Sequence, residues 1–209
     1  MPSEFERSVF VNCPFDEEFR PVLEAILFCV IDCGLSPRIA TERLDSGEVR
    51  LDKIVSLIRA CKYSIHDLSR VQAAEAGEFA RLNMPFELGV DFGVASSGSR
   101  KYSTKRLLVT ANEQYKYQAA ISDIAGWDIR SHNNEYATAF RAVRDWLAAN
   151  GLKAHPAARI EGHYLGFQEW SYERLLDEGW DERDIQQRAT PDVLDSMLTW
   201  VEVGRPMTY

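Results

Sequence analysis

The spacing of apolar residues along this chain switches repeatedly between the period of a strand and the period of a helix. Short runs rich in β-branched and aromatic residues, bounded by turn-forming residues, predict strands. Between them, apolar residues that recur every three or four positions predict amphipathic helices. The expected strands are residues 8–12, 37–41, 63–68, 106–110 and 127–130. The expected helices run from a cap at Asp16 to Gly34, from about Leu51 to Cys61, from Pro85 through Val94, and from Tyr136 to Asn150, with residues 112–125 a weaker candidate.

This alternation of strands and helices predicts a parallel sheet, because successive parallel strands need right-handed helical crossovers. Five strands in this rhythm predict a flavodoxin-like, doubly wound α/β core over about residues 6–153. Two polar segments, residues 42–47 and 69–83, are expected to be loops. The expected architecture is therefore a five-stranded parallel sheet with helices on both faces.

The uneven distribution of charge predicts a boundary near residue 153. Residues 154–209 contain no lysine and hold 5 Arg against 11 Asp and Glu, a net charge of −6 out of −8 for the whole chain. This segment also carries Trp170, Trp180 and Trp200, and Thr190-Pro191-Asp192 is a typical helix start within it. We expect residues 1–153 to form the α/β domain and residues 154–209 to form an acidic, Trp-rich helical tail.

Length and composition are those of an ordinary globular protein. The chain has 209 residues, enough for one domain and an appendage. Its longest apolar stretches are far shorter than the roughly 20 residues that cross a bilayer, and its first residues lack the apolar core of a signal peptide, so we expect a cytoplasmic protein. The four cysteines form no Cys-x-x-Cys pair, which argues against disulfides and structural zinc. An excess of 32 acidic over 24 basic residues argues against sequence-independent binding to nucleic acid.

Candidate ligand-binding residues gather where the expected strands end. In an open parallel sheet the ligand crevice lies beyond the carboxyl ends of the strands, where the strand order reverses. The first turn lacks the glycine patterns that cradle phosphates in Rossmann and P-loop proteins, so neither class is indicated. The candidates are Asn12, Phe15 and Asp16 after the first strand, Asp67 and Ser69 after the third, and Asn83 and Glu87 near the start of the next helix.

Glu87 is the candidate with the most specific chemistry. It lies two residues into the expected helix and beside Gly89, whose missing side chain would permit close approach of a ligand or strand. One interpretation is a carboxylate near a helix N-terminus, stabilised by the helix dipole. The other is a carboxylate that attacks or stabilises an oxocarbenium-like centre at a glycosidic bond. The residues themselves leave both interpretations open.

Asp67 also has two interpretations. It can cap backbone amides where the strand ends, or it can bind sugar hydroxyls and act as an acid/base partner of Glu87. His66 should point to the opposite face of the strand, which favours a packed or an exposed position over a catalytic role. The other histidines lack the spacing of metal ligands, and Cys29 and Cys33 share an apolar face, so we expect neither a metal site nor a bound cofactor.

Three sequence blocks stand in an informative order. Residues 8–16 are SVFVNCPFD, residues 61–69 are CKYSIHDLS, and residues 83–89 are NMPFELG. Together they resemble TIR-like nucleotide-binding proteins and the related nucleoside 2-deoxyribosyltransferases over about residues 8–95, and more loosely to about residue 150. Those families are flavodoxin-like, with Asp-Leu-Ser/Thr at the end of the third strand and Glu-Leu-Gly on the following helix.

The resemblance implies an enzyme that cleaves or transfers the N-glycosidic bond of NAD or a nucleoside, with Glu87 in the position of the catalytic glutamate. NAD would be a substrate rather than a cofactor. The resemblance also implies a role in bacterial antiviral defence or nucleotide signalling, and self-association, which the apolar tail residues Trp170 and Trp200 favour as well. The alternative is a non-catalytic nucleotide sensor or adaptor that binds a protein partner through its tail.

Overall fold

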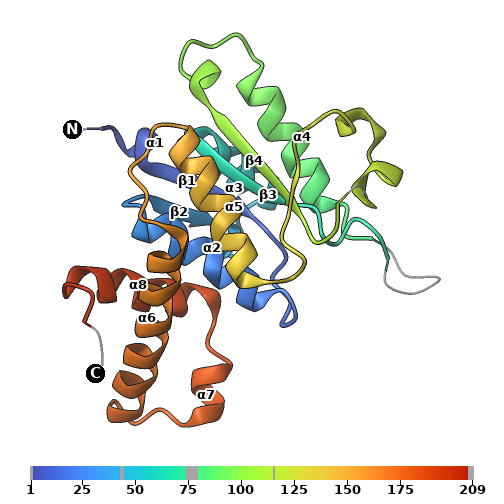
Figure 1. The fold of residues 1–209 in the computed structure, drawn as a ribbon. Helices are drawn as coiled ribbons and strands as arrows, with labels where there is room; N and C mark the ends of the chain where they lie inside the picture. The colour runs from blue at the N-terminus through green and yellow to red at the C-terminus, as the bar shows by residue number, and fades with distance from the viewer. Residues whose placement is uncertain (1, 43–44, 74–79, 115, 207–209) are drawn as a thin grey trace.

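The centre of the molecule is an all-parallel sheet of five strands in the order β2-β1-β3-β4-β5 (Figure 1). The computed structural model describes residues 2–42, 45–73, 80–114 and 116–206. The strand order and the parallel pairing confirm the predicted flavodoxin-like α/β class. The strands are β1 (Ser8–Asn12), β2 (Ser36–Ile39), β3 (Tyr63–Asp67), β4 (Arg106–Ala111) and β5 (Arg130–Ser131).

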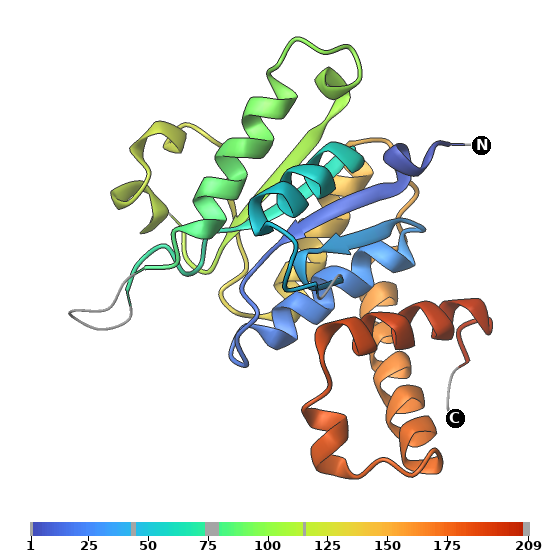
Figure 2. The same cartoon turned by 180° about the vertical axis from the view of Figure 1, so that it is seen from behind.

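Helices cover both faces of the sheet, as Figure 1 and the reverse view in Figure 2 show. On one face, α2 (Arg20–Asp32) packs beside α5 (Tyr136–Ala149). On the other face, α3 (Arg50–Ala60) packs beside α4 (Asn83–Ala95). A short α1 (Glu4–Arg7) precedes β1, and 3-10 turns occupy Ala40–Glu42, Tyr102–Thr104, Lys116–Ala119 and Ser122–Ile124.

Local sequence signals explain most boundaries of these elements. Gly34 and Gly151 adopt positive φ angles of 78° and 83° and follow the ends of α2 and α5, as expected. The predicted start of α2 is wrong, because Asp16 accepts a hydrogen bond from the Phe19 amide in a separate turn and the helix begins at Arg20. Pro21 then occupies the first turn of α2, where its missing N–H costs no helical bond.

The segment between β4 and α5 differs from the expectation. Residues 112–125 contain two 3-10 turns in place of the expected helix, and β5 is only two residues long. The helix α4 begins at Asn83, two positions before the expected Pro85. Parts of the two expected loops, residues 43–44 and 74–79, lie outside the described residues.

The tail consists of α6 (Ala157–Asp177), α7 (Glu182–Gln186) and α8 (Thr190–Glu202). Helices α6 and α8 pack against α2, and α6 also packs against α5 (Figure 1). Trp200 is fully buried, with its ring centroid 5.6 Å from that of Phe28 in α2, so tail and sheet domain share one hydrophobic cluster. Packing inside a single chain therefore accounts for Trp200, which removes it as an argument for self-association.

In the described part of the chain, no helix combines the length and the apolar character needed to cross a bilayer.

Candidate functional site

The carboxyl ends of β1 and β3 form the switch point of the sheet, from which their loops diverge to opposite sides. Asn12 ends β1 at this point and is almost completely buried. Its side-chain amide donates hydrogen bonds to the Met84 carbonyl oxygen (3.1 Å) and to His66 Nδ1 (3.1 Å). The first of these bonds ties the end of β1 to the start of α4, three positions before Glu87. Asn12 and the segment that carries Glu87 are thus at the same edge.

His66 continues a buried polar chain into the protein. With its Nδ1 accepting from Asn12, the neutral ring carries its proton on Nε2, which donates to Asp91 Oδ2 at 3.1 Å. Asp91 Oδ1 is 3.1 Å from Lys105 Nζ, and all three ionisable side chains are fully buried. Burial alone would raise the pKa of Asp91, but His66 and Lys105 lower it below its usual value. The sequence allowed a packed or an exposed position for His66, and the structure shows it fully buried.

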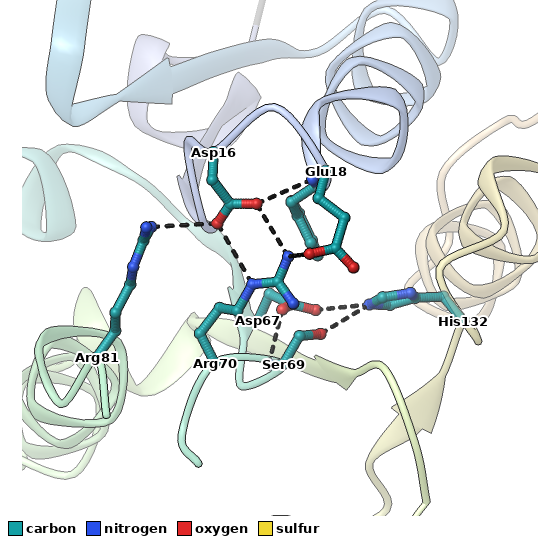
Figure 3. Close-up of polar contacts among 8 residues, drawn as sticks. Asp16, Glu18, Asp67, Ser69, Arg70, Arg81 and His132 are labelled. Carbon is teal, nitrogen blue, oxygen red and sulfur yellow. Dashed lines mark hydrogen bonds and ion pairs between the residues drawn. The ribbon is translucent and has the colours of Figure 1, made fainter. Parts of the chain in front are cut away.

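Asp67 lies in a second buried network, which Figure 3 shows. Its Oδ1 accepts from the Ser69 amide (2.9 Å), and its Oδ2 accepts from Thr110 Oγ1 (2.8 Å) and His132 Nε2 (2.9 Å). His132 Nδ1 accepts from the Asn134 amide, so its proton is on Nε2. Ser69 Oγ is 3.2 Å from the same Nε2. A serine nucleophile needs its carboxylate and its hydroxyl on different imidazole nitrogens, so these three side chains are arranged for bracing rather than for nucleophilic catalysis.

Replacing Asp67 with asparagine is expected to destabilise the fold by about 2 kcal/mol. The new NH2 group would face a donor in either orientation, the Ser69 amide or the His132 Nε2 proton, and His132 cannot change tautomer while its Nδ1 accepts from Asn134. Urea unfolding of Asp67→Asn beside wild type measures the loss. A variant of unchanged stability would show that Asp67 is not held by these bonds.

Asp67 and Glu87 face different sides of the sheet. Successive residues of a strand point to opposite faces, and Ile65 packs in the cluster shared with α2 and α5. Asp67 follows Ile65 by two positions, and its partner His132 packs on Phe19 just before α2, with ring centroids 5.5 Å apart. Glu87 instead contacts α3 on the other face. The structure does not bring the two expected acid/base partners together.

Glu87 is a desolvated carboxylate with one exposed counter-charge. It is the fifth residue of α4 rather than the third of a helix that starts at Pro85, and its side chain is only 6% exposed. Arg50 Nη2, from the start of α3, lies 3.6 Å from Glu87 Oε1, and its side chain is 58% exposed. Burial raises the pKa of Glu87 above its usual value, and the charge of Arg50 only partly opposes this. A Cβ at Gly89 would contact no described atom within 4 Å, so no described strand approaches this glycine closely and the space beside it is open.

Replacing Glu87 with glutamine is expected to stabilise the fold near neutral pH. Because the folded pKa is raised, wild-type stability falls as the pH rises from the unfolded pKa through the folded pKa. Glutamine does not titrate, so the variant should melt about 2–4 °C higher at pH 7, on the order of 1 kcal/mol, and the difference should shrink toward pH 5. Melting curves at several pH values measure this. A variant less stable than wild type at pH 7 would assign Glu87 a structural role.

A cluster of ion pairs joins the loops that follow β1 and β3 (Figure 3). Arg70 reaches Asp16 with two nitrogens, Nη2 to Oδ1 at 2.9 Å and Nε to Oδ2 at 3.3 Å, and also reaches Glu18 at 2.7 Å. Arg81 Nη1 lies 3.2 Å from Asp16 Oδ2. Burial raises the pKa of Asp16, but the hydrogen bonds from Arg70 and the Phe19 amide, with both arginine charges, lower it overall. Two arginines thus converge on one carboxylate at the switch point.

A hollow of about 190 Å³ lies beside this cluster, at the carboxyl ends of β3 and β4. Ser69 and Arg70 line it from the β3 side, and Asn112 lines it from the β4 side. Two other candidates lie at the same edge with exposed side chains: Phe15 in the loop after β1, and Asn83 at the first position of α4. These residues remain available to a ligand.

The described residues include one group with metal-ligand chemistry, and it lies away from this edge. Asp32 ends α2, which runs antiparallel to the strands, and its oxygens accept from Nδ1 of His155 (2.9 Å) and of His163 (2.8 Å). Arg205 Nε is 3.4 Å from Asp32 Oδ1, and Arg159 Nε is 3.5 Å from His163 Nε2. The candidate ligand atoms are already hydrogen-bonded to one another, and the guanidinium groups of Arg159 and Arg205 lie beside them. The group therefore fits a polar contact that holds the tail against α2 better than it fits a metal centre.

Comparison with known proteins gives no family for this chain. No protein-family model matches it, and no curated protein was found to be related to it.

Sequence reasoning missed several residues of this edge. Arg50 and Arg81 lie in polar segments without a periodic pattern, and His132 is separated by 65 positions from Asp67. Arg70 alone carried a signal, because it directly follows Ser69 at the end of β3, where candidate ligand-binding residues were expected. The other partners are set by packing of distant segments, which the sequence does not display.

Proposed function

We propose that this protein cleaves or transfers the N-glycosidic bond of NAD or of a related nucleotide or nucleoside, with Glu87 as the reacting carboxylate. The observation that carries this proposal is a buried carboxylate, with a raised pKa, at the ligand-binding edge of a flavodoxin-like sheet. Its counter-ion among the described residues is the exposed Arg50, 3.6 Å away, which a substrate can displace without entering the core. The order of the three sequence blocks supports the same class of reaction.

The chemistry follows from where positive charge develops. Breaking a glycosidic bond leaves positive charge on the ribose, so a carboxylate in a partly dry site stabilises the transition state more than the ground state. Glu87 would either attack the anomeric carbon or stabilise that charge while water or another acceptor attacks. Asn12 holds α4 in place through Met84, and Asp67 braces the end of β3. Of the two expected catalytic residues, Asp67 therefore enters this proposal as a positioning residue.

A base-release assay tests the proposal. The purified chain is incubated with NAD and with a panel of purine and pyrimidine nucleosides and nucleotides, and free base is quantified by chromatography. We expect release of nicotinamide or of a nucleobase from at least one substrate. Binding without release of any base would contradict the enzymatic proposal.

A second candidate is a non-catalytic nucleotide sensor. The low exposure of Glu87, 6% of its side chain, and its pairing with Arg50 favour this candidate, since a reacting carboxylate must reach the substrate. In that case a nucleotide binds the same edge and the acidic tail binds a protein partner. For a sensor, we expect calorimetry to detect binding of NAD or a nucleotide and the base-release assay to detect no free base.

The cellular role and the oligomeric state are proposed from the resemblance alone. We propose a role in antiviral defence or nucleotide signalling in the cytoplasm, and self-association of the chain, because relatives of this kind commonly complete their sites across subunits. Sedimentation of the purified chain at high micromolar concentration tests the last point, and a monomer there would contradict it.

A further inference from the structure

Two arginines stand side by side at the base of the segment that links β3 to α4. The Arg81 amide donates to the Arg70 carbonyl oxygen at 3.0 Å, so the backbone itself closes this segment and brings the two residues together. Both side chains then turn toward Asp16 in the loop after β1 (Figure 3). This pairing arises from the backbone and does not depend on the ion pairs alone.

The two guanidinium groups converge on one carboxylate as they would on an oxyanion ligand. Asp16 receives Arg70 through two nitrogens and Arg81 through one, at distances between 2.9 and 3.3 Å. A brace between two loops needs only one of these arginines, and Arg81 remains 51% exposed while making its contact. Planar guanidinium groups suit the bidentate recognition of phosphate, which offers more oxygens and more charge than a carboxylate.

The location suits the phosphate of a ligand. Arg70 lines the hollow at the ends of β3 and β4, together with the hydroxyl-bearing Ser69. Arg81 lies two positions before the start of α4, a helix of 13 residues whose N-terminal amides add positive potential.

We propose that Arg70 and Arg81 form the phosphate site of this edge, and that Asp16 occupies the place of the ligand's phosphate in the unliganded chain. The ligand is then a phosphorylated nucleotide or dinucleotide rather than a free nucleoside; naming it a nucleotide rests on the proposed function. On binding, the phosphate takes both guanidinium groups from Asp16 and that of Arg70 also from the exposed Glu18, while Asp16 keeps its hydrogen bond from the Phe19 amide. Asp16 is therefore an internal competitor that discriminates against weakly charged ligands.

Inorganic pyrophosphate is the probe, titrated by calorimetry at low ionic strength into wild type and variants. Asp16→Asn keeps an oxygen for the Phe19 amide and removes only the charge, so its affinity for pyrophosphate should be about fivefold to tenfold higher than that of wild type. Arg70→Met/Arg81→Met should bind pyrophosphate at least about tenfold more weakly. Asp128→Asn and Arg100→Met/Arg130→Met make the same charge changes elsewhere on the surface and should stay within about twofold of wild type.

The opposite results would contradict the proposed phosphate site. Asp16→Asn with wild-type or weaker affinity would mean that Asp16 is a loop brace and not a competitor. If the double arginine variant melts far below wild type, Arg81→Met replaces it, because this half-exposed side chain can be changed without loss of packing. Unchanged pyrophosphate affinity in Arg81→Met, or in a folded double variant, would equally sink the proposal.

A comparison of AMP with adenosine tests whether the ligand is phosphorylated. Wild type should bind AMP at least about tenfold more tightly than adenosine, and this preference should vanish in the arginine variant. An equal affinity for both would overturn the assignment of a phosphorylated ligand. If the chain releases base but the Asp16 and arginine variants bind pyrophosphate like wild type, only the phosphate site is contradicted. If the variants change pyrophosphate affinity as expected but no substrate releases base, only the proposed reaction is contradicted.

Discussion

Replacing Glu87 with glutamine is expected to lower the rate of base release by at least about a hundredfold, or about 2.7 kcal/mol of transition-state stabilisation. Glutamine keeps the size and shape of the side chain but cannot stabilise positive charge on the ribose or attack the anomeric carbon. Since the lost interaction belongs to the transition state, kcat should fall far more than KM rises. Stability should not fall, because burial already disfavours the charged form of this carboxyl group.

Initial rates with the substrate found in the base-release panel measure this effect. Glu173→Gln is the matched control, because Glu173 is an exposed residue of α6 in the tail and the change is chemically identical. The control should keep the wild-type rate. Near-normal turnover of Glu87→Gln would remove Glu87 from the chemistry.

Replacing Asp91 with leucine is expected to lower the free energy of unfolding by about 3–5 kcal/mol. Asp91 and Lys105 are a fully buried ion pair with 3.1 Å between Oδ1 and Nζ. Lys105 also donates to the Ile58 and Cys61 carbonyl oxygens at 2.9 and 2.6 Å, so it cannot simply move to solvent. The variant leaves the Lys105 ammonium buried without a counter-charge and removes the carboxylate that accepts a hydrogen bond from His66 Nε2.

Thermal and urea unfolding measure this loss, with an expected fall in melting temperature of roughly 6–20 °C for a chain of this size. The double variant Asp91→Leu/Lys105→Met removes the stranded charge and should recover at least about half of the lost stability. A single variant that loses less than about 1 kcal/mol, or a double variant no better than the single, would contradict a buried pair of this kind.

Much of the fold follows from local patterns, because strands and helices of an α/β protein each have a strong hydrophobic period. The run 8–12 has apolar side chains on both faces and forms an interior strand of the sheet, and the glycines that follow α2 and α5 supply the left-handed residues their ends need. Residues 112–125 have no dominant period, and they form 3-10 turns rather than the expected helix. The start of α2 was misplaced because an aspartate caps an isolated turn as readily as it caps a helix.

The candidate site was less predictable, because its chemistry depends on pairs formed between distant segments. Ligands of an open parallel sheet bind beyond the carboxyl ends of its strands, where the strand order reverses, and this rule placed Asn12 and Glu87 at one edge of the sheet. The hydrogen bond from Asn12 to Met84 agrees with it. The rule gives the edge but not the direction of each side chain, so it did not show that Asp67 turns toward His132 and Glu87 toward Arg50. The same limit hid the convergence of Arg70 and Arg81 on Asp16.

The most direct measurement is an experimental structure of Glu87→Gln with an uncleaved substrate, NAD or the nucleotide that the panel identifies. The variant should hold the substrate intact, with the anomeric carbon of the ribose within about 3–3.5 Å of the side chain at position 87. The phosphate should lie against Arg70 and Arg81, with Asp16 displaced from both. A substrate bound at another place on the chain, or at this edge with its ribose turned away from position 87, would contradict an N-glycosidic site built on Glu87.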